Sequence, residues 1–211
     1  DIENYEDNNK QLLEYLSIEK ENAKLYSVDN TSYKHMINLN NMNFELLNNG
    51  TKGYAYILNN NGYQVKIAQY ESKLKSFCPL QIRISSEYLW AYGLSTAWSM
   101  IFNWIVETFG NIISEKVCRV DLCTHISGID LITNYENSYK GHFKRETFYS
   151  GTNINAITFG RRQTKNIYCR IYNKSLELQE KRHKTWFYEI WQKHDMDIKN
   201  VWNIEFELKS E

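Results

Sequence analysis

The sequence has few of the residues that interrupt regular structure or mark special chemistry. It holds one proline, nine glycines and four cysteines in 211 residues, and no apolar run approaches the ~20 residues of a membrane-spanning helix. Neither GxGxxG nor GxxxxGK[ST] occurs, which argues against a nucleotide-hydrolysing site. The cysteines form no CxxC pair, which favours free buried thiols in a reducing compartment over disulfides or zinc. We therefore expect a cytoplasmic protein with no membrane partner.

An excess of either charge is also lacking, since 25 basic residues balance 25 acidic ones. The chain thus has no overall positive field of the kind that steers many nucleic-acid binders. The charges are uneven, however: the segment through Asp29 is acid-rich, and Lys140–Lys184 holds a cationic surplus. A local basic stripe is enough to bind a phosphate backbone.

The length and the 42% hydrophobic content favour one domain with a full core. We expect residues 1–50 to be a polar segment that belongs partly to this domain, and residues 51–211 to form the main domain, which the family resemblance described below implies to be the catalytic one. Because the chain begins at Asp1 rather than methionine, we also expect it to be a piece of a longer protein.

The first half of the chain predicts a weak helix, three strands and a strong helix. Residues 1–30 indicate a frayed helix or a linker. Residues 53–69 predict a hairpin around NNNG, and a third strand begins at Leu80. A long amphipathic helix is expected from an N-cap at Ser95 to a stop at Gly110.

The second half predicts three more strands, at residues 118–126, from about 166, and at 201–209, with a charged helix over roughly 176–193 between the last two. This order of elements predicts an α+β fold with an antiparallel sheet. We expect the helices to pack on one face of the sheet and the active site to lie on the open face.

Period-two alternation gives each of these three strands a polar face. In the first strand the polar side chains are Arg119, Asp121, Cys123 and His125, against Val120, Leu122, Thr124 and Ile126 toward the core. In the second they are Asn166, Tyr168, Arg170, Tyr172 and Lys174. In the third they are Asn203, Glu205, Glu207 and Lys209, against Trp202, Ile204, Phe206 and Leu208 toward the core.

If these strands pair in one sheet, the tyrosines, cations and acids meet on one surface. A tyrosine nucleophile needs a nearby cation or metal to stabilise its phenolate, and Arg170 and Lys174 lie two residues either side of Tyr172. Carboxylates with one imidazole suit Mg²⁺ or Mn²⁺. The alternatives are a solvated cationic edge strand, a salt bridge from Asp121 to Arg119 or Arg170, and a surface His125.

Three motifs carry a family resemblance: CRVDLCTH at 118–125, FGRRQTKNIYCRIYNKSLE at 159–177 and VWNIEFELK at 201–209. In this order they resemble the trans-acting replication initiators (Rep) of rolling-circle plasmids, whose domain also occurs in relaxases of integrative conjugative elements and in phage-type initiators. The resemblance implies that Tyr172 nicks one DNA strand and becomes linked to the 5′ phosphate. It also implies that Asp121 and Glu205, with Glu207, hold a metal ion.

The resulting hypothesis is a metal-dependent DNA nickase and strand transferase of a bacterial mobile element. The expected catalytic residues are Tyr172, Arg170, Lys174 and Glu177, the last as a base or to orient Lys174. The expected DNA-binding residues are Arg161, Arg162, Lys165 and Arg119. The expected ligands of Mg²⁺ or Mn²⁺ are Asp121, Glu205, Glu207 and His125.

The chain departs from the family pattern at His125, where a second acid is expected, and at Asn203, where an arginine is common. Tyr168 is either a second nucleophile or a decoy. The expected partner is DNA, as an origin hairpin with a single-stranded nick site; the sequence leaves open a helicase, the conjugation machinery and a homodimer. A catalytically inactive DNA-binding regulator of the same fold and an unrelated α+β interaction domain remain the alternatives.

Overall fold

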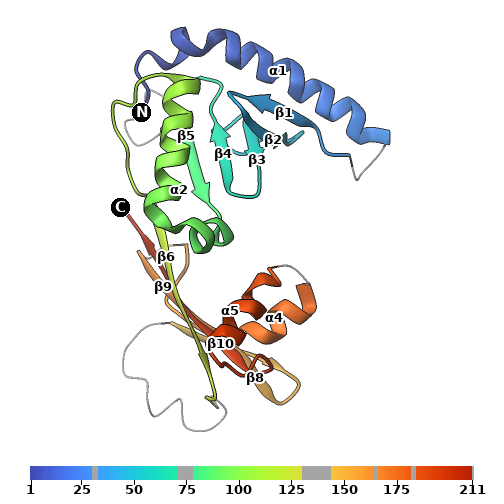
Figure 1. Cartoon of the computed structure of the whole chain (residues 1–211), viewed down its shortest axis with the longest axis vertical. Coiled ribbons are helices and arrows are strands. Elements are labelled where there is room, and N and C mark those ends of the chain that lie inside the picture. The colour runs from blue at the N-terminus through green and yellow to red at the C-terminus, as the bar shows by residue number, and fades with distance from the viewer. Residues whose placement is uncertain (30–32, 71–77, 130–143, 164–165, 182–183, 211) are drawn as a thin grey trace. The chain divides into compact units, whose positions relative to one another are not determined.

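The computed structural model describes residues 1–29, 33–70, 78–129, 144–163, 166–181 and 184–210. Contacts divide the chain into two compact units, Asp1–Glu115 and Lys116–Glu211. Each unit combines helices with a five-stranded antiparallel sheet, which confirms the predicted α+β class (Figure 1). The unit boundary does not fall near residue 50, where we expected the polar segment to end; the assignment of residues 51–211 as the catalytic domain stays a prediction.

The sheet of the N-terminal unit is a simple meander in the order β1-β2-β3-β4-β5. Its strands are β1 (Met36–Leu39), β2 (Met42–Leu46), β3 (Tyr56–Asn59), β4 (Tyr63–Ile67) and β5 (Leu80–Ile84). The predicted hairpin and third strand are confirmed as β3, β4 and β5. The hairpin of β1 and β2 was not predicted; it turns at Asn40 and Asn41, whose φ angles of 45° and 63° lie in the left-handed region that asparagine tolerates.

Two helices cover one face of this sheet. Helix α1 (Tyr5–Asp29), expected as a frayed helix or linker, runs for 25 residues and buries Tyr5 and Leu16 in the core. Helix α2 (Ser86–Phe109) is broken at Gly93, so the predicted start at Ser95 marks only its second part, whereas the predicted stop at Gly110 is confirmed. No helix in the described part of the chain is long and apolar enough to span a membrane.

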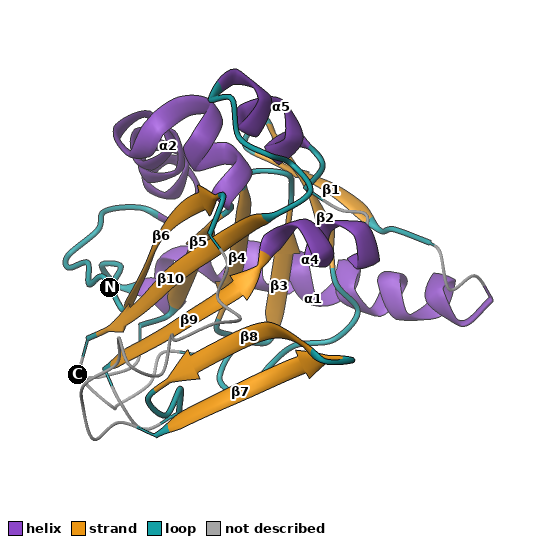
Figure 2. Cartoon of the chain, turned by 90° about the horizontal axis from the view of Figure 1, so that it is seen from below, coloured by secondary structure: helices purple, strands orange, loops and turns teal. Residues whose placement is uncertain are grey.

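The C-terminal unit contains the three predicted polar strands in one sheet, in the order β6-β10-β9-β8-β7 (Figure 2). These are β6 (Arg119–Ser127), β9 (Ile167–Asn173) and β10 (Val201–Lys209), with β10 in the middle of the three. The hairpin of β7 (Arg145–Ser150) and β8 (Asn153–Phe159) was not predicted. The single expected helix over 176–193 is two helices, α4 (Lys174–Lys181) and α5 (Trp186–Lys193).

Helices α4 and α5 pack on the polar face of this sheet, not on the opposite face as expected. Leu178 and Trp191 form a buried cluster with Val201, and Trp191 also contacts His125. Val201 lies two residues before Asn203 on β10, and His125 is the register partner of Asn203 on β6. Both side chains therefore project to the same side of the sheet as Asn203. The candidate site therefore lies beside the helices.

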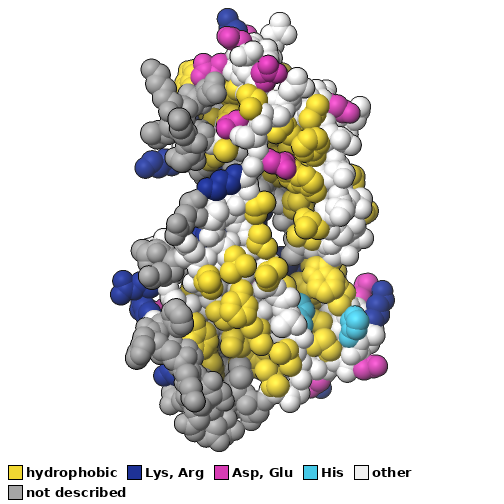
Figure 3. Space-filling model, turned by 90° about the vertical axis from the view of Figure 1, so that its left-hand side faces the viewer, with side chains coloured by type: hydrophobic (Ala, Val, Ile, Leu, Met, Phe, Trp, Pro, Cys, Tyr) yellow, Lys and Arg dark blue, Asp and Glu magenta, His cyan; other side chains and the backbone are white. Residues whose placement is uncertain are grey.

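The burial of the middle strand differs from the prediction on its polar face, whereas Trp202 is buried as predicted. Asn203, Glu205 and Glu207 were expected to face solvent but are buried, whereas Phe206 was expected in the core and is 44% exposed. The helices and the long cationic side chains of this unit lie over the polar face of β10. On β6, an outer strand of the sheet, Leu122 was also expected in the core and is 55% exposed. Figure 3 shows hydrophobic side chains gathered over the C-terminal unit.

The cysteines are free thiols, as predicted, but they are not buried. Cys118 and Cys123 are exposed, and Cys78 and Cys169 are half-buried. Cys123 is exposed because β6 is an outer strand of the sheet, and both of its faces are exposed from Arg119 to Thr124.

Candidate active site

Tyr172 lies near the end of β9, with Asn203 of β10 as its register partner. Its phenol oxygen accepts hydrogen bonds from Asn203 Nδ2 at 2.9 Å and from Lys174 Nζ at 3.3 Å. The hydroxyl donates to Glu205 Oε2 at 3.5 Å. One reactive oxygen therefore contacts two nitrogen donors and one carboxylate.

Two cations flank the ring of Tyr172. The sequence predicted that Lys174 continues the strand, but Lys174 begins α4. Its side chain is buried, and its ammonium pairs with Glu177. The guanidinium of Arg170 lies 4.8 Å from the ring centroid, and its Nη2 donates to both oxygens of Glu205 at 3.0 Å. The structure thus brings Tyr172, Arg170, Lys174 and Glu177 together, while their catalytic roles stay predictions.

The surroundings of Tyr172 hold its hydroxyl in the protonated form. Burial is the largest cause that raises the pKa of Tyr172, and the charge of Glu177 adds to it. The hydrogen bond from Asn203 and the charge of Arg170 lower the pKa but do not compensate. Because the phenol stays neutral at ordinary pH, any nucleophilic role for Tyr172 needs a proton acceptor, and the hydroxyl donates to the carboxylate of Glu205.

A second polar cluster lies farther along the same face, around Glu207, which is register partner to Asp121 and Tyr168. Its carboxylate is 2% exposed and pairs with Arg119 Nη2 at 2.7 Å, Arg162 Nε at 2.9 Å and Lys209 Nζ at 2.9 Å.

The ionisation of Glu207 follows from these partners. Burial alone would raise the pKa of Glu207, but the hydrogen bonds from Lys209 and Arg162, together with the charges of Arg119 and Arg162, lower it below the ordinary value. The carboxylate is therefore a fixed negative charge inside a ring of cations.

The predicted metal ligands share one face but do not form a metal site. Asp121 is held at both oxygens by Arg119, at 2.6 and 2.7 Å, which is the salt-bridge alternative raised by the sequence. Arg170 holds Glu205, and three cations hold Glu207. Among the described residues no three His, Cys, Asp or Glu side chains converge on one point. The donor set as arranged does not fit a divalent ion, because every carboxylate already has a cationic partner.

His125 is placed as a hydrogen-bond acceptor rather than as a ligand. The indole Nε1–H of Trp191 donates to His125 Nδ1 at 3.0 Å, and the ring of Phe187 packs edge-on at 4.7 Å. Burial, reinforced by the charge of Lys174, lowers the pKa of His125 to about 4. A neutral imidazole whose Nδ1 accepts a hydrogen bond carries its own hydrogen on Nε2, so neither nitrogen offers a free lone pair to a metal in this arrangement.

The predicted DNA-binding residues fall into three groups. Arg119 and Arg162 meet at Glu207, Arg161 is exposed, and Lys165 lies outside the described residues. Sequence reasoning missed the roles of Asn203 and Lys209 as partners of Tyr172 and Glu207. The alternation of the sequence predicted that both residues lie on the polar face of the strand, but it could not predict the register that aligns them with their partners.

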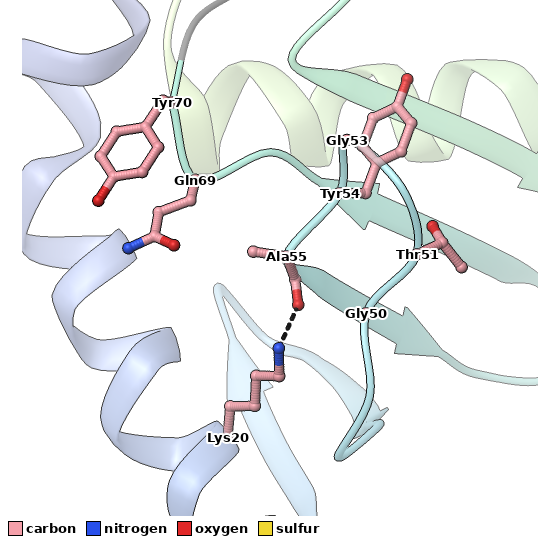
Figure 4. Close-up of a pocket in the computed structure, with 8 residues that line it drawn as sticks. All are labelled: Lys20, Gly50, Thr51, Gly53, Tyr54, Ala55, Gln69 and Tyr70. Atoms are coloured by element: carbon pink, nitrogen blue, oxygen red, sulfur yellow. Dashed lines mark hydrogen bonds between the residues drawn. The ribbon is translucent and has the colours of Figure 1, made fainter.

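A separate pocket of about 390 Å³ lies in the N-terminal unit (Figure 4). Its lining includes Lys20, Thr51, Tyr54 and Tyr70, none of which the sequence had singled out. Lys20 Nζ donates to the carbonyl of Ala55 at 2.8 Å. The lysine therefore holds the backbone of the segment before β3.

Comparison with known proteins gives a likeness to solved structures alone. No protein-family model matches the chain, and no curated protein sequence matches it. Among solved structures, the chain is similar to a rolling circle replication initiator protein from Geobacillus stearothermophilus, at 17% identity and a TM-score of 0.46. The likeness covers 81% of this chain and 62% of that one, so the chain spans less than two thirds of the length of its structural neighbour.

Proposed function

We propose that the C-terminal unit nicks DNA and transfers the cut strand through Tyr172, in the initiation of rolling-circle replication or conjugative transfer. The observation that carries this proposal is the phenol oxygen of Tyr172, which contacts the acceptor Glu205 and the donors Asn203 and Lys174 at 3.5, 2.9 and 3.3 Å. The resemblance of the three sequence motifs to replication initiators supports the choice of DNA as substrate.

The chemistry is a transesterification in which one phosphate ester replaces another. Glu205 takes the proton of the Tyr172 hydroxyl as the oxygen attacks phosphorus. The new bond joins the Tyr172 oxygen to the 5′ phosphate, and the bond from phosphorus to the 3′ oxygen breaks. The leaving 3′ oxygen takes up one proton, from the ammonium of Lys174 or from water, and remains as a free hydroxyl. The reverse reaction joins a new 3′ end to the same phosphate.

The cations beside Tyr172 stabilise the charge that develops on the phosphate oxygens. Lys174 already contacts the attacking oxygen, and Arg170 lies against the ring. Binding of Mg²⁺ or Mn²⁺ stays a separate proposal. The carboxylates are neutralised by arginine and lysine in this arrangement, so the steps above use only the groups of the chain.

The direct test is formation of a covalent protein–DNA adduct. Purified protein is incubated with an end-labelled pool of single-stranded and hairpin oligonucleotides, with Mn²⁺ or with EDTA, and adducts are separated under denaturing conditions. We expect an adduct whose modified peptide maps to Tyr172 and which the Tyr172→Phe variant does not form. Tyr168→Phe is the matched control, because Tyr168 lies on the same strand face, and it should still react.

An adduct formed by Tyr172→Phe would reject Tyr172 as the nucleophile. Binding of the oligonucleotides without any adduct would instead support the second candidate, a DNA-binding regulator that does not cleave. The raised pKa of Tyr172 is the observation that favours this second candidate.

A further inference from the structure

The buried carboxylate of Glu207 pairs with more cations than are required to neutralise its charge. One cation would neutralise it, but Arg119, Arg162 and Lys209 all pair with it within 2.9 Å. Asp121, held by Arg119, supplies the second negative charge in the cluster. Three cations against two carboxylates leave one net positive charge. A purely structural salt bridge does not require this excess.

The three cations are also accessible, although the carboxylate that holds them is not. The side chains of Arg119, Arg162 and Lys209 are 41%, 49% and 31% exposed, against 2% for Glu207. Only Nε of Arg162 is used by side chains in the described part of the protein, so the terminal nitrogens of this guanidinium can donate to a ligand. Planar guanidinium groups match the oxygens of a phosphate.

The cluster lies on the same strand face as the phenol of Tyr172. Glu207 pairs across the sheet with Tyr168, which is four residues before Tyr172 on β9. Four residues of extended strand span ~13 Å. The guanidinium of Arg162 lies 5.8 Å from the ring centroid of Tyr168. A DNA strand with its scissile phosphate at Tyr172 can thus bring a flanking phosphate to the cluster.

We propose that Glu207 is a positioning residue that holds Arg119, Arg162 and Lys209 as a binding site for a second phosphate of the DNA strand. This inference rests on the proposed function, since it takes DNA as the ligand. It replaces the metal-ligand role that the sequence suggested for Glu207. A divalent ion bound there would lie among three cations, whereas a phosphate diester brings the negative charge that the cluster lacks.

The test is equilibrium binding in EDTA, measured by fluorescence anisotropy with a labelled single-stranded oligonucleotide of mixed sequence. All proteins carry Tyr172→Phe, so that no strand transfer occurs. The affinity is measured over a series of NaCl concentrations. Arg162→Gln should reduce the slope of log K against log[salt] by about 0.7, the value for one lost contact to a single strand.

Glu207→Gln gives the sharper result, because it removes a negative charge. If charge alone decided, this variant would bind DNA more tightly. If Glu207 positions the cations, it should bind roughly tenfold more weakly. Glu146→Gln is the matched control: it removes the same charge from an exposed pair with Lys144 in the same unit, and it should not weaken binding.

A folded Glu207→Gln protein that binds as tightly as its parent, or more tightly, would overturn the inference. If thermal unfolding shows that this variant does not fold, Arg162→Gln and Lys209→Gln decide, and an unchanged salt slope in both overturns it. Failure of the proposed function is a different result, namely no adduct from the wild-type protein.

Discussion

The side-chain amide of Asn203 lies 2.9 Å from the phenol oxygen of Tyr172, its register partner on the neighbouring strand. This N–H stabilises a phenolate more than a phenol, because the bond strengthens as negative charge develops. We predict that Asn203→Ala lowers the single-turnover rate of adduct formation about 10²-fold. Asn153→Ala, an exposed change in the same unit, is the control, and equal rates for the two variants would contradict the assignment.

Glu205 and Glu177 compete for the role of proton acceptor. Glu205 accepts a hydrogen bond from Tyr172, at 3.5 Å, and Glu177 pairs with Lys174. Glu205→Gln should therefore reduce adduct formation by about 10²–10⁴-fold, the usual contribution of a general base. Glu177→Gln should have a smaller effect, exerted through Lys174. If Glu177→Gln reduced the rate of adduct formation more than Glu205→Gln in the same single-turnover assay, the role of general base would be assigned to Glu177.

The pair of Lys174 and Glu177 also stabilises the fold. The side chains of Lys174 and Glu177 are 7% and 21% exposed, so replacing Lys174 removes an ammonium that pairs with a poorly solvated carboxylate. We predict that Lys174→Met lowers the free energy of unfolding by about 3 kcal/mol, and that adding Glu177→Met restores most of it. Urea unfolding of the two single variants and the double variant forms a double-mutant cycle. Additive losses would show that the two side chains are not coupled.

The sequence was sufficient to predict which residues share a strand face. Alternation places Tyr172 with Arg170, and Glu205 with Glu207, whatever the surroundings. The strands β6, β9 and β10 were found for this reason. The hairpin of β7 and β8 was missed, although Gly151, whose φ is 63°, marks its turn.

The sequence could not predict what covers each face. Glu205 and Glu207 read as solvent-facing because acids rarely lie in the interior without partners. Their burial depends on Arg119, Arg162 and Arg170, which come from other parts of the chain. The predicted metal site depended on the same free carboxylates. Long-range pairing of this kind is set by strand register and helix position, which leave no local signal.

The stability of the protein should depend on the protonation of His125. Its folded pKa of about 4 lies below the ordinary value of 6.5. Between these values the unfolded chain binds a proton that the folded chain, with Trp191 donating to Nδ1 and Lys174 nearby, does not bind. The free energy of unfolding therefore falls as the pH drops from about 6.5 toward 4, by on the order of 1–3 kcal/mol.

The comparison is urea unfolding of the wild type and His125→Asn at a series of pH values. The variant should lack this pH dependence while its amide oxygen still accepts the indole N–H. The measurements above pH 4.5 are the informative ones. Because the pKa of Glu207 is lowered, the stability that its ionised carboxylate contributes is lost only below that pH. Parallel stability profiles for the two proteins would show that His125 does not titrate as described.

The break in α2 should make a side chain at Gly93 destabilising. Its φ of 75° and ψ of 164° lie in a region open almost only to glycine, yet a Cβ there would meet no atom within 4 Å. The cost of Gly93→Ala is thus backbone strain without steric overlap, and we predict a loss of about 1–3 kcal/mol in the free energy of unfolding. Gly151→Asn, at a φ of 63° that asparagine tolerates, should change it by less than about 0.5 kcal/mol. If Gly93→Ala were as stable as the wild type, the helix would be free to run straight through this position, and the break would belong to the packing around α2 rather than to its glycine.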